Sequence, residues 1–169
     1  MAEEKCPKHD VPLKLRRNLT TDELALACPF CDAEQQAQDK NLSATHVIVP
    51  REDGRTIVGY ITLVSSVVPL SDYPPSLKRV SDKPNLPALL LAKMAVDSAH
   101  KGKDLGEFLL KHALVTARQM KDASGCFLVV VDAKDENSKN FYVKYGFTPF
   151  PDRNLRLFMP MKTIDGLMR

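Results

Sequence analysis

The sequence has no apolar run that approaches the length needed to cross a membrane. Its N-terminus, Met1 to Lys5, is charged and is not followed by the apolar segment of a secretory signal. It also has no internal repeat and no low-complexity segment. These absences exclude a helical membrane protein, and we expect a cytoplasmic location.

The chain also lacks a strong charge of one sign. Its 24 Lys and Arg and 21 Asp and Glu give a net charge of +3, too little to indicate a partner. Residues 1–40 hold 6 basic and 8 acidic residues (−2), and residues 41–169 hold the other 18 and 13 (+5). The larger segment is mildly basic, as a site for an anionic cofactor or nucleic acid would be, although ordinary solubility explains the same charge.

Length and composition suit one globular domain with a small appendage, since 44% of the 169 residues are hydrophobic. The composition shifts near residue 40, which predicts a small module over residues 1–40 and a larger domain over residues 41–169. In the larger domain, the apolar patterns predict the order β-β-loop-β-α-β-α-β. This order indicates an α/β (α+β) fold, with a mixed central sheet flanked by helices.

The expected elements are as follows. Strands are predicted over residues 45–49, 57–64, 88–96, 126–131 and 156–161, and helices over residues 104–123 and 137–145, which end at Gly125 and Gly146. Residues 32–40 read as a short helix or linker, and residues 52–55 as a turn. Five prolines between Ser65 and Pro87 argue against a continuous strand there and leave one helical turn near residues 74–79.

The segment from Met94 to Gly106 joins a buried strand to a long helix through a turn with glycines and lysines. The start of a helix has unpaired N–H groups and the positive end of the helix dipole, so it can hold phosphate. Glycines let the backbone approach a ligand closely. A pyrophosphate site is therefore a sound physical expectation, although many strand-to-helix turns share these residues.

Two motifs resemble those of the GNAT acetyltransferase superfamily. Lys101, Asp104 and Gly106 occupy the three defined positions of its acetyl-CoA motif, Arg/Gln-x-x-Gly-x-Gly/Ala. Residues 137–147 resemble its Asn…Phe-Tyr-x-x-x-Gly-Phe signature. The resemblance covers residues 41–169 and implies the GNAT fold and acetyl-CoA-dependent N-acetyltransferase activity.

The resemblance also implies roles for single residues. Tyr142 matches the general acid that protonates the leaving thiolate, and the backbone at Val96 or its neighbour would polarise the thioester carbonyl. Asn137 resembles a position that binds the pantetheine arm. The full expected set for acetyl-CoA is Ala95, Val96, Lys101, Gly102, Lys103, Asp104, Leu105, Gly106 and Asn137.

Two positions depart from the motif. Lys101 stands where Arg or Gln is usual, and its ammonium group can still donate hydrogen bonds to a phosphate. Asp104 stands where Gly is usual, and its carboxylate would repel a pyrophosphate unless it points away or caps the helix.

Within the superfamily, the likeness is greatest to the GNAT toxins of bacterial toxin–antitoxin pairs. It rests on residues 41–47, 90–97, 131–134 and 155–161. This branch implies aminoacyl-tRNA as the substrate, a ribbon-helix-helix antitoxin as a partner, and a homodimer. Basic residues that would contact RNA are Lys93, Lys78, Arg79, Lys83 and Lys144.

Two other functions stay open at this point. One is an N-acetyltransferase for a protein or small-molecule amine. The other is an inactive GNAT domain in a zinc-dependent nucleic-acid-binding or regulatory protein, which Asp104 would favour.

The first 31 residues contain Cys6-x2-His9 and Cys28-x2-Cys31. Each pair can present two ligands to one tetrahedral Zn²⁺ ion, and the chain between them could form a hairpin around Asn18 to Thr21. This resembles a zinc ribbon with a structural ion, because four protein ligands leave no open position for catalysis.

The remaining reactive side chains have no assigned chemistry. Cys126 reads as a small buried residue of a strand, and His112 as a packing or surface residue. Tyr145 fits packing better than catalysis. His46 and His100 are ambiguous, and no firm general base is evident; an aminoacyl amine that is partly neutral would not need one.

Overall fold

The computed structural model describes residues 14–17, 24–27, 40, 42–51, 56–73 and 83–167. Its contacts divide the chain into two compact units, Met1–Thr45 and His46–Arg169. None of the described helices is both long and apolar enough to span a membrane.

The first unit contains a small antiparallel hairpin. Strand β1 (Lys14–Arg17) pairs with β2 (Leu24–Ala27), with Lys14 opposite Ala27. This pairing confirms the hairpin expected between Cys6-x2-His9 and Cys28-x2-Cys31. The turn residues 18–21 and the expected helix or linker over residues 32–39 lie outside the described residues.

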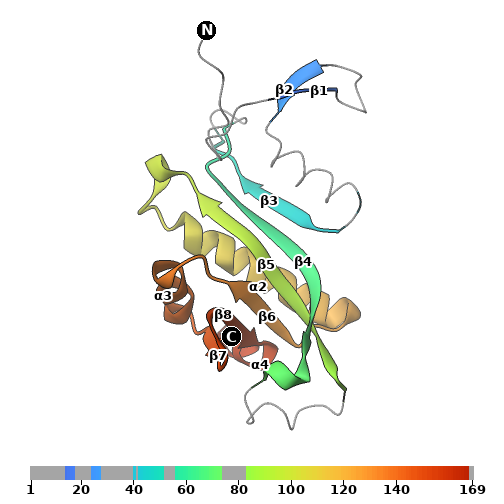
Figure 1. Cartoon of the computed structure of the whole chain (residues 1–169). Helices are drawn as coiled ribbons and strands as arrows, with labels where there is room; N and C mark the ends of the chain where they lie inside the picture. The colour runs from blue at the N-terminus through green and yellow to red at the C-terminus, as the bar shows by residue number, and fades with distance from the viewer. Residues whose placement is uncertain are drawn as a thin grey trace. The chain divides into compact units, whose positions relative to one another are not determined.

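A six-stranded sheet forms the centre of the larger part of the chain (Figure 1), and its strand order is β3-β4-β5-β6-β8-β7. Strands β5 and β6 pair in parallel, whereas β4–β5, β6–β8 and β7–β8 are antiparallel, so the predicted mixed sheet is confirmed. The strands are β3 (Ala44–Ile48), β4 (Gly59–Pro69), β5 (Asn85–Val96), β6 (Leu128–Asp132), β7 (Thr148–Phe150) and β8 (Arg153–Pro160).

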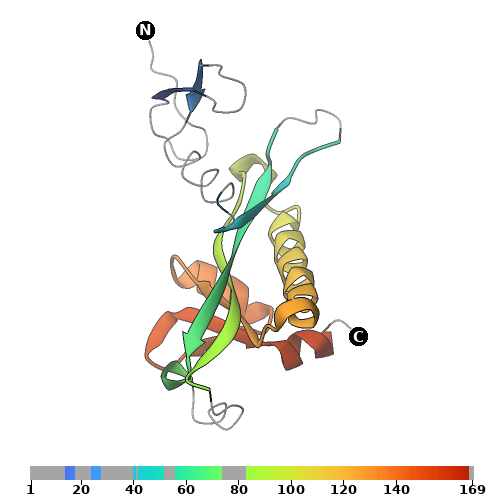
Figure 2. The same cartoon turned by 90° about the vertical axis from the view of Figure 1, so that its right-hand side faces the viewer.

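The helices α2 (Leu105–Ser124), α3 (Glu136–Lys144) and α4 (Met161–Leu167) bury their apolar sides in one core cluster. Sheet residues in that cluster alternate along each strand, as a strand period of two requires. Figure 2 shows α2 running beside the sheet on this side. The fully buried members from strands and helices include Ile61, Leu109, Leu110, Val129, Leu157, Met159 and Ile164.

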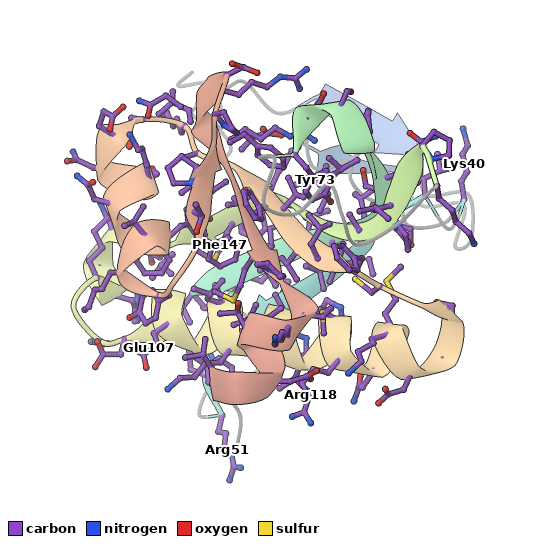
Figure 3. The ribbon with its side chains drawn as sticks, turned by 90° about the horizontal axis from the view of Figure 1, so that it is seen from below. Lys40, Arg51, Tyr73, Glu107, Arg118 and Phe147 are labelled. Atoms are coloured by element: carbon purple, nitrogen blue, oxygen red, sulfur yellow. The ribbon has the colours of Figure 1, made fainter. Side chains whose placement is uncertain are left out.

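The other face of the sheet carries a second, smaller cluster. Tyr73 follows the 3-10 turn Leu70–Asp72, and its ring lies 6.1 Å from the rings of both Phe150 and Phe158. Tyr73 of this cluster and Phe147 of the first cluster are labelled apart from each other in Figure 3. The Tyr73 hydroxyl is buried without a hydrogen-bond partner among the described residues, so its ring acts there as an apolar filler.

The proline-rich interpretation of residues 65–87 is partly wrong. Strand β4 extends to Pro69, and β5 begins at Asn85 and includes Pro87. Both prolines lie near strand ends, where a missing N–H costs little in the ladder. The helical turn expected over residues 74–79 lies outside the described residues. Strand β7 and helix α4 were not expected, because both are too short to show a clear period.

A pair of histidines joins β3 to α2. The rings of His46 and His112 lie 4.5 Å apart between centroids, edge to face. The His112 Nε2 atom is buried and has no hydrogen-bond partner among the described residues. Burial, and secondly the nearby His112, lower the pKa of His46 below its usual 6.5. The fold therefore favours the neutral form of His46.

This pKa shift predicts a loss of stability in acid. Below pH about 6.5 the unfolded chain binds a proton at His46 more readily than the folded chain does. The free energy of unfolding therefore decreases as the pH is lowered. His46→Gln removes this titration, and we expect the decrease in melting temperature between pH 7.5 and 5.5 to be smaller than in the wild type. His100→Gln, at a histidine that pairs with Asp97 at the surface, is the matched control. Equal decreases in wild type and His46→Gln would contradict the assignment.

Candidate functional site

The central strands β5 and β6 pair over only part of their length. The parallel register joins Ala88–Leu91 to Leu128–Val131, yet β5 continues to Val96. Opposite β4, Thr62 pairs with Lys93 and Leu63 pairs with Leu91, so Ala92 is an extra residue in β5. Such a bulge bends its strand and increases its twist. Beyond it, β5 has a ladder partner only on the β4 side among the described residues, and its other edge is open to a ligand.

The open half of β5 presents different residues to the two faces of the sheet. Met94 and Val96 are half-buried and pack on the core cluster beneath the helices. Lys93 and Ala95 are exposed, and since paired residues share a face, they lie with Thr62 and Tyr60 on the opposite side. A ligand along this edge would therefore meet backbone from β5 and polar side chains from one face.

The expected phosphate turn follows directly after β5. A 3-10 turn, Ser98–His100, is capped by the Asp97 carboxylate, which accepts from the Ala99 N–H at 3.1 Å. Residues 101–104 are exposed and lead into α2. Gly102 has φ +77°, a left-handed conformation that glycine adopts without steric cost. The turn thus brings the expected residues Lys101 to Gly106 together at the start of the helix.

Asp104 has a backbone conformation that explains why glycine is usual there. Its φ of 55° makes it the only non-glycine residue with positive φ in the described chain. Aspartate tolerates this left-handed region better than most residues. Of the two alternatives left open for its side chain, capping does not occur, because the Asp104 carboxylate makes no capping hydrogen bond. Only its carbonyl takes part in the helix, accepting from the Phe108 N–H at 3.0 Å.

Tyr142 lies on α3, which follows β6, the other of the two parting strands. It is 7% exposed, between the rings of Phe141 and Phe147 at 5.2 and 5.6 Å. Burial raises the pKa of Tyr142 to about 12, so its hydroxyl is protonated at neutral pH. Among the described residues, that hydroxyl has no hydrogen-bond partner, which leaves it available to donate to a ligand.

Two aromatic residues of α3 contact the first turn of α2. The Phe141 ring lies beside Gly106, where a Cβ atom would meet it at 3.7 Å. The Tyr145 hydroxyl donates to Glu107 Oε2 at 2.7 Å, and Lys111 Nζ lies 2.6 Å from Glu107 Oε1. Figure 3 shows Glu107 at the α3 end of α2. Sequence reasoning missed this contact. The only local signal, a glutamate three positions after the helix cap, predicts a bond to the N–H at the cap of the same helix and not to Tyr145.

The remaining expected residues lie at different places. Asn137 is exposed in the first turn of α3, and Lys144 Nζ lies 5.5 Å from the Tyr145 ring centroid. Lys83 precedes β5, and at about 3.3 Å per residue it lies roughly 30 Å from Lys93 at the other end of that strand. The structure therefore does not bring Lys83 together with Lys93. Lys78 and Arg79 lie outside the described residues.

The expected zinc ligands Cys6, His9, Cys28 and Cys31 also lie outside the described residues. Within the part of the chain that the structure describes, no group of three or more His, Cys, Asp or Glu side chains could hold a metal ion. Cys126 is buried as expected, and its thiol donates to the Leu128 carbonyl.

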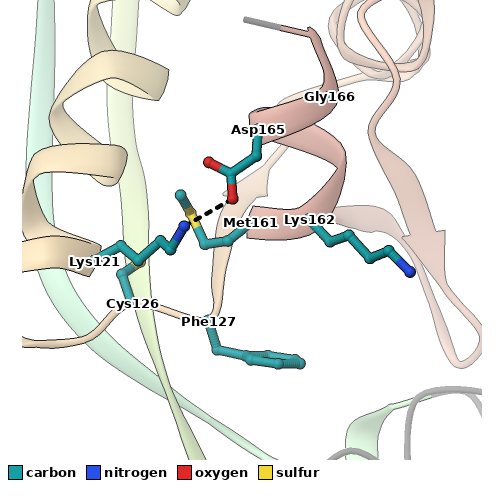
Figure 4. Close-up of a pocket in the computed structure, with 7 residues that line it drawn as sticks. All are labelled: Lys121, Cys126, Phe127, Met161, Lys162, Asp165 and Gly166. Carbon is teal, nitrogen blue, oxygen red and sulfur yellow. Dashed lines mark hydrogen bonds and ion pairs between the residues drawn. The ribbon is translucent and has the colours of Figure 1, made fainter. Parts of the chain in front are cut away.

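A surface hollow of about 450 Å³ lies at the far end of α2 (Figure 4). Its lining residues are Lys121, Cys126, Phe127, Met161, Lys162, Asp165 and Gly166. Lys121 lies roughly 24 Å along the helix from Leu105. The Asp165 carboxylate is already paired, with Lys121 at 2.8 Å and Arg118 at 3.5 Å. This hollow is therefore separate from the phosphate turn.

Comparisons with known proteins agree with this geometry. Residues 43–149 match the family described as acetyltransferase (GNAT) domain. The chain is 33% identical to the "tRNA-acetylating toxin" of Mycobacterium tuberculosis over 148 residues, 82% of this chain and 88% of that protein.

Solved structures share the fold. AtaT complexed with acetyl-methionyl-tRNAfMet has a TM-score of 0.77 at 23% identity, covering 83% of this chain and 84% of that one. A Tyr-to-Phe mutant of AtaT, bound to the C-terminus of the antitoxin AtaR and acetyl-CoA, has a TM-score of 0.67 at 23% identity, covering 79% and 78%.

The Asp104 carboxylate is expected to weaken binding of an anionic ligand at the turn. Asp104→Asn removes the charge and keeps a residue that tolerates positive φ, so we expect the dissociation constant for acetyl-CoA to fall about two- to fivefold. Calorimetric titration measures this change, and it should shrink at high salt. Asp104→Ala is the matched variant: it also removes the charge, but it should lower stability by about 1 kcal/mol because alanine resists this conformation. Unchanged affinity in Asp104→Asn would show that the carboxylate points away from the ligand.

Proposed function

Because this chain belongs to the GNAT acetyltransferase family, we propose that it is a toxin that transfers the acetyl group of acetyl-CoA to the α-amine of aminoacyl-tRNA. The chain is an N-acetyltransferase of that family, and the substrate is the part proposed here. The observation that carries the chemistry is the buried, protonated Tyr142 on the helix that follows the strand β6, in the same core cluster on which Met94 and Val96 of β5 pack.

Acetyl-CoA fits the open edge and the turn as one extended ligand. The pyrophosphate would lie at the N–H groups that start α2, with Lys101 and Lys103 supplying positive charge. The pantetheine arm would run along the edge of β5 at Ala95 and Val96. The Asp97 N–H bonds the Val58 carbonyl on the β4 side, so the alternation of the strand turns the Val96 backbone to the open edge, where it can pair with the amides of the arm. Asn137, in the first turn of α3, would hydrogen-bond the same arm. Gly102, Asp104, Leu105 and Gly106 complete the turn.

The transfer step needs few groups from the protein. The neutral amine attacks the thioester carbonyl carbon, the carbon–sulfur bond breaks, and the thiolate takes a proton from the Tyr142 hydroxyl. The amine nitrogen loses one proton to water as the amide forms, and the Tyr142 phenolate regains one from water. A backbone N–H at Val96 would stabilise the developing negative charge on the carbonyl oxygen. Since burial keeps Tyr142 protonated up to pH about 12, it can serve as the acid throughout the physiological range.

Aminoacyl-tRNA is favoured as the acceptor over other amines. The relative from Mycobacterium tuberculosis is named a tRNA-acetylating toxin, and 82% of this chain aligns with it. Lys93 is exposed on the sheet face opposite α2, where its ammonium group would contact RNA phosphates, and Lys144 lies on α3.

Acetyl transfer to charged tRNA is the direct test. We expect wild-type protein, given labelled acetyl-CoA, to label aminoacyl-tRNA and to leave uncharged tRNA unlabelled. Tyr142→Phe removes only the acidic hydroxyl, so kcat should fall by about a hundredfold or more while the fold and acetyl-CoA binding are kept. Lys93→Glu should raise KM for tRNA and leave KM for acetyl-CoA unchanged.

Each other outcome selects a different function. Labelling of a protein or small amine, with none on tRNA, would replace the acceptor and keep the enzyme class. Full activity of Tyr142→Phe would remove this residue from the role of acid. Failure of the wild type to bind acetyl-CoA would favour a regulatory protein without activity.

We also propose an antitoxin as a partner, because AtaT is bound to the antitoxin AtaR in one of the structures that share this fold. A small ribbon-helix-helix protein encoded beside this chain is the expected form. A homodimer and a cytoplasmic location are consistent with that proposal.

A structural zinc ion in the first unit is a further part of the proposal. The β1–β2 pairing brings Lys14 opposite Ala27, so the chain enters and leaves the hairpin at the same end. Cys6 and His9 precede β1, and Cys28 and Cys31 follow β2. Two such pairs would suit a tetrahedral zinc site at that end.

Metal analysis tests the zinc site. We expect the purified chain to contain about one equivalent of zinc, and Cys31→Ala to lose it, because three ligands hold the ion less tightly than four. Cys126→Ala is the matched control and should keep the metal, since that thiol is buried in the sheet. Equal zinc content in both variants, or none in the wild type, would rule out this site.

A further inference from the structure

The first turn of α2 is acidic, although it is the expected site of an anion. Asp104 precedes the helix and Glu107 is its third residue. A glutamate at this third position commonly folds back and accepts a hydrogen bond from the N–H at the helix cap. That arrangement would cover the N–H groups that a phosphate needs and would place a carboxylate beside it.

In this structure, Glu107 makes other contacts. The Tyr145 hydroxyl occupies Oε2 at 2.7 Å, and the Lys111 ammonium lies 2.6 Å from Oε1. The Lys111 and Tyr145 hydrogen bonds lower the pKa of Glu107, so the carboxylate is ionised at neutral pH. The Asp104 side chain makes no capping hydrogen bond either. No acidic side chain of this turn is therefore seen to cap the start of α2.

Ring packing and a hydrogen bond both support the contact between Tyr145 and Glu107. Tyr145 ends α3, and its ring lies 5.0 Å from Phe141, which also packs beside Gly106 of α2. The hydrogen bond to Glu107 raises the pKa of Tyr145 to about 12, so the hydroxyl remains a donor at all physiological pH values. Lys111, by contrast, is an exposed neighbour on the same helix and can hold Glu107 in more than one orientation.

We propose that Tyr145 is a positioning residue: it holds the Glu107 carboxylate away from the start of α2 and so keeps the helix N–H groups available to the pyrophosphate of acetyl-CoA. This rests on the proposed function, because it assumes that acetyl-CoA is the ligand. Without the Tyr145 hydroxyl, Glu107 is free to fold back and compete with the pyrophosphate.

Tyr145→Phe tests this role, since it keeps the ring and its packing. We expect KM for acetyl-CoA to rise about three- to tenfold, the size of one hydrogen bond of ordinary net strength, with kcat within about twofold of wild type. S-acetylpantetheine, which has no pyrophosphate, should be used equally well by both proteins. Glu107→Ala added to Tyr145→Phe should restore KM for acetyl-CoA, because alanine has neither the charge nor an acceptor atom that could cap the helix.

Tyr73→Phe is the matched control, since its hydroxyl has no partner among the described residues and lies on the other face of the sheet. It should leave both KM values unchanged. An unchanged KM in Tyr145→Phe, an equal loss with both acetyl donors, or no restoration by Glu107→Ala would each overturn the proposal. A wild type without acetyl-CoA activity would instead contradict the proposed function.

Discussion

The bulge at Ala92 is the feature on which the site depends. By inserting one residue into β5, it ends the pairing with β6 after Leu91 and bends the strand away. A continuous parallel pair would satisfy the backbone groups of both strands and leave no edge for a ligand. The bulge therefore turns part of a central strand, which is usually buried on both sides, into an edge that can pair with an extended substrate.

The helices place the chemical groups around this edge. Both α2 and α3 pack on the same face of the sheet, and each follows one of the two parting strands. The start of α2 supplies N–H groups for an anion, and α3 supplies Tyr142. Phe141 and Tyr145 link the two helices directly, through Gly106 and Glu107. The proposed anion site and the proposed acid would thus be supported by one packed unit, in which a change in either helix reaches the other.

Charge at the turn reflects two opposing requirements. A left-handed residue is needed before α2, and Asp104 meets this need at the cost of a negative charge beside the anion site. Glu107 adds a second carboxylate, which Lys111 and Tyr145 engage. Lys101 and Lys103 supply the positive charge. On the opposite face of the sheet lie Lys93 and the polar side chains beside it, so the donor and acceptor substrates would approach the open edge from different sides.

The sequence by itself determined the main elements, because long apolar runs and helical spacing depend on local order alone. The central strand ending at Val96, the helix from Leu105 and the short helix carrying Tyr142 were all predictable in this way. The family motifs likewise made the turn from Lys101 to Gly106 predictable. Only the tertiary structure decided the rest. The register at Ala92, the left-handed backbone of Asp104 and the contact of Tyr145 with Glu107 depend on partners that are distant along the chain, or on backbone angles that residue types do not fix.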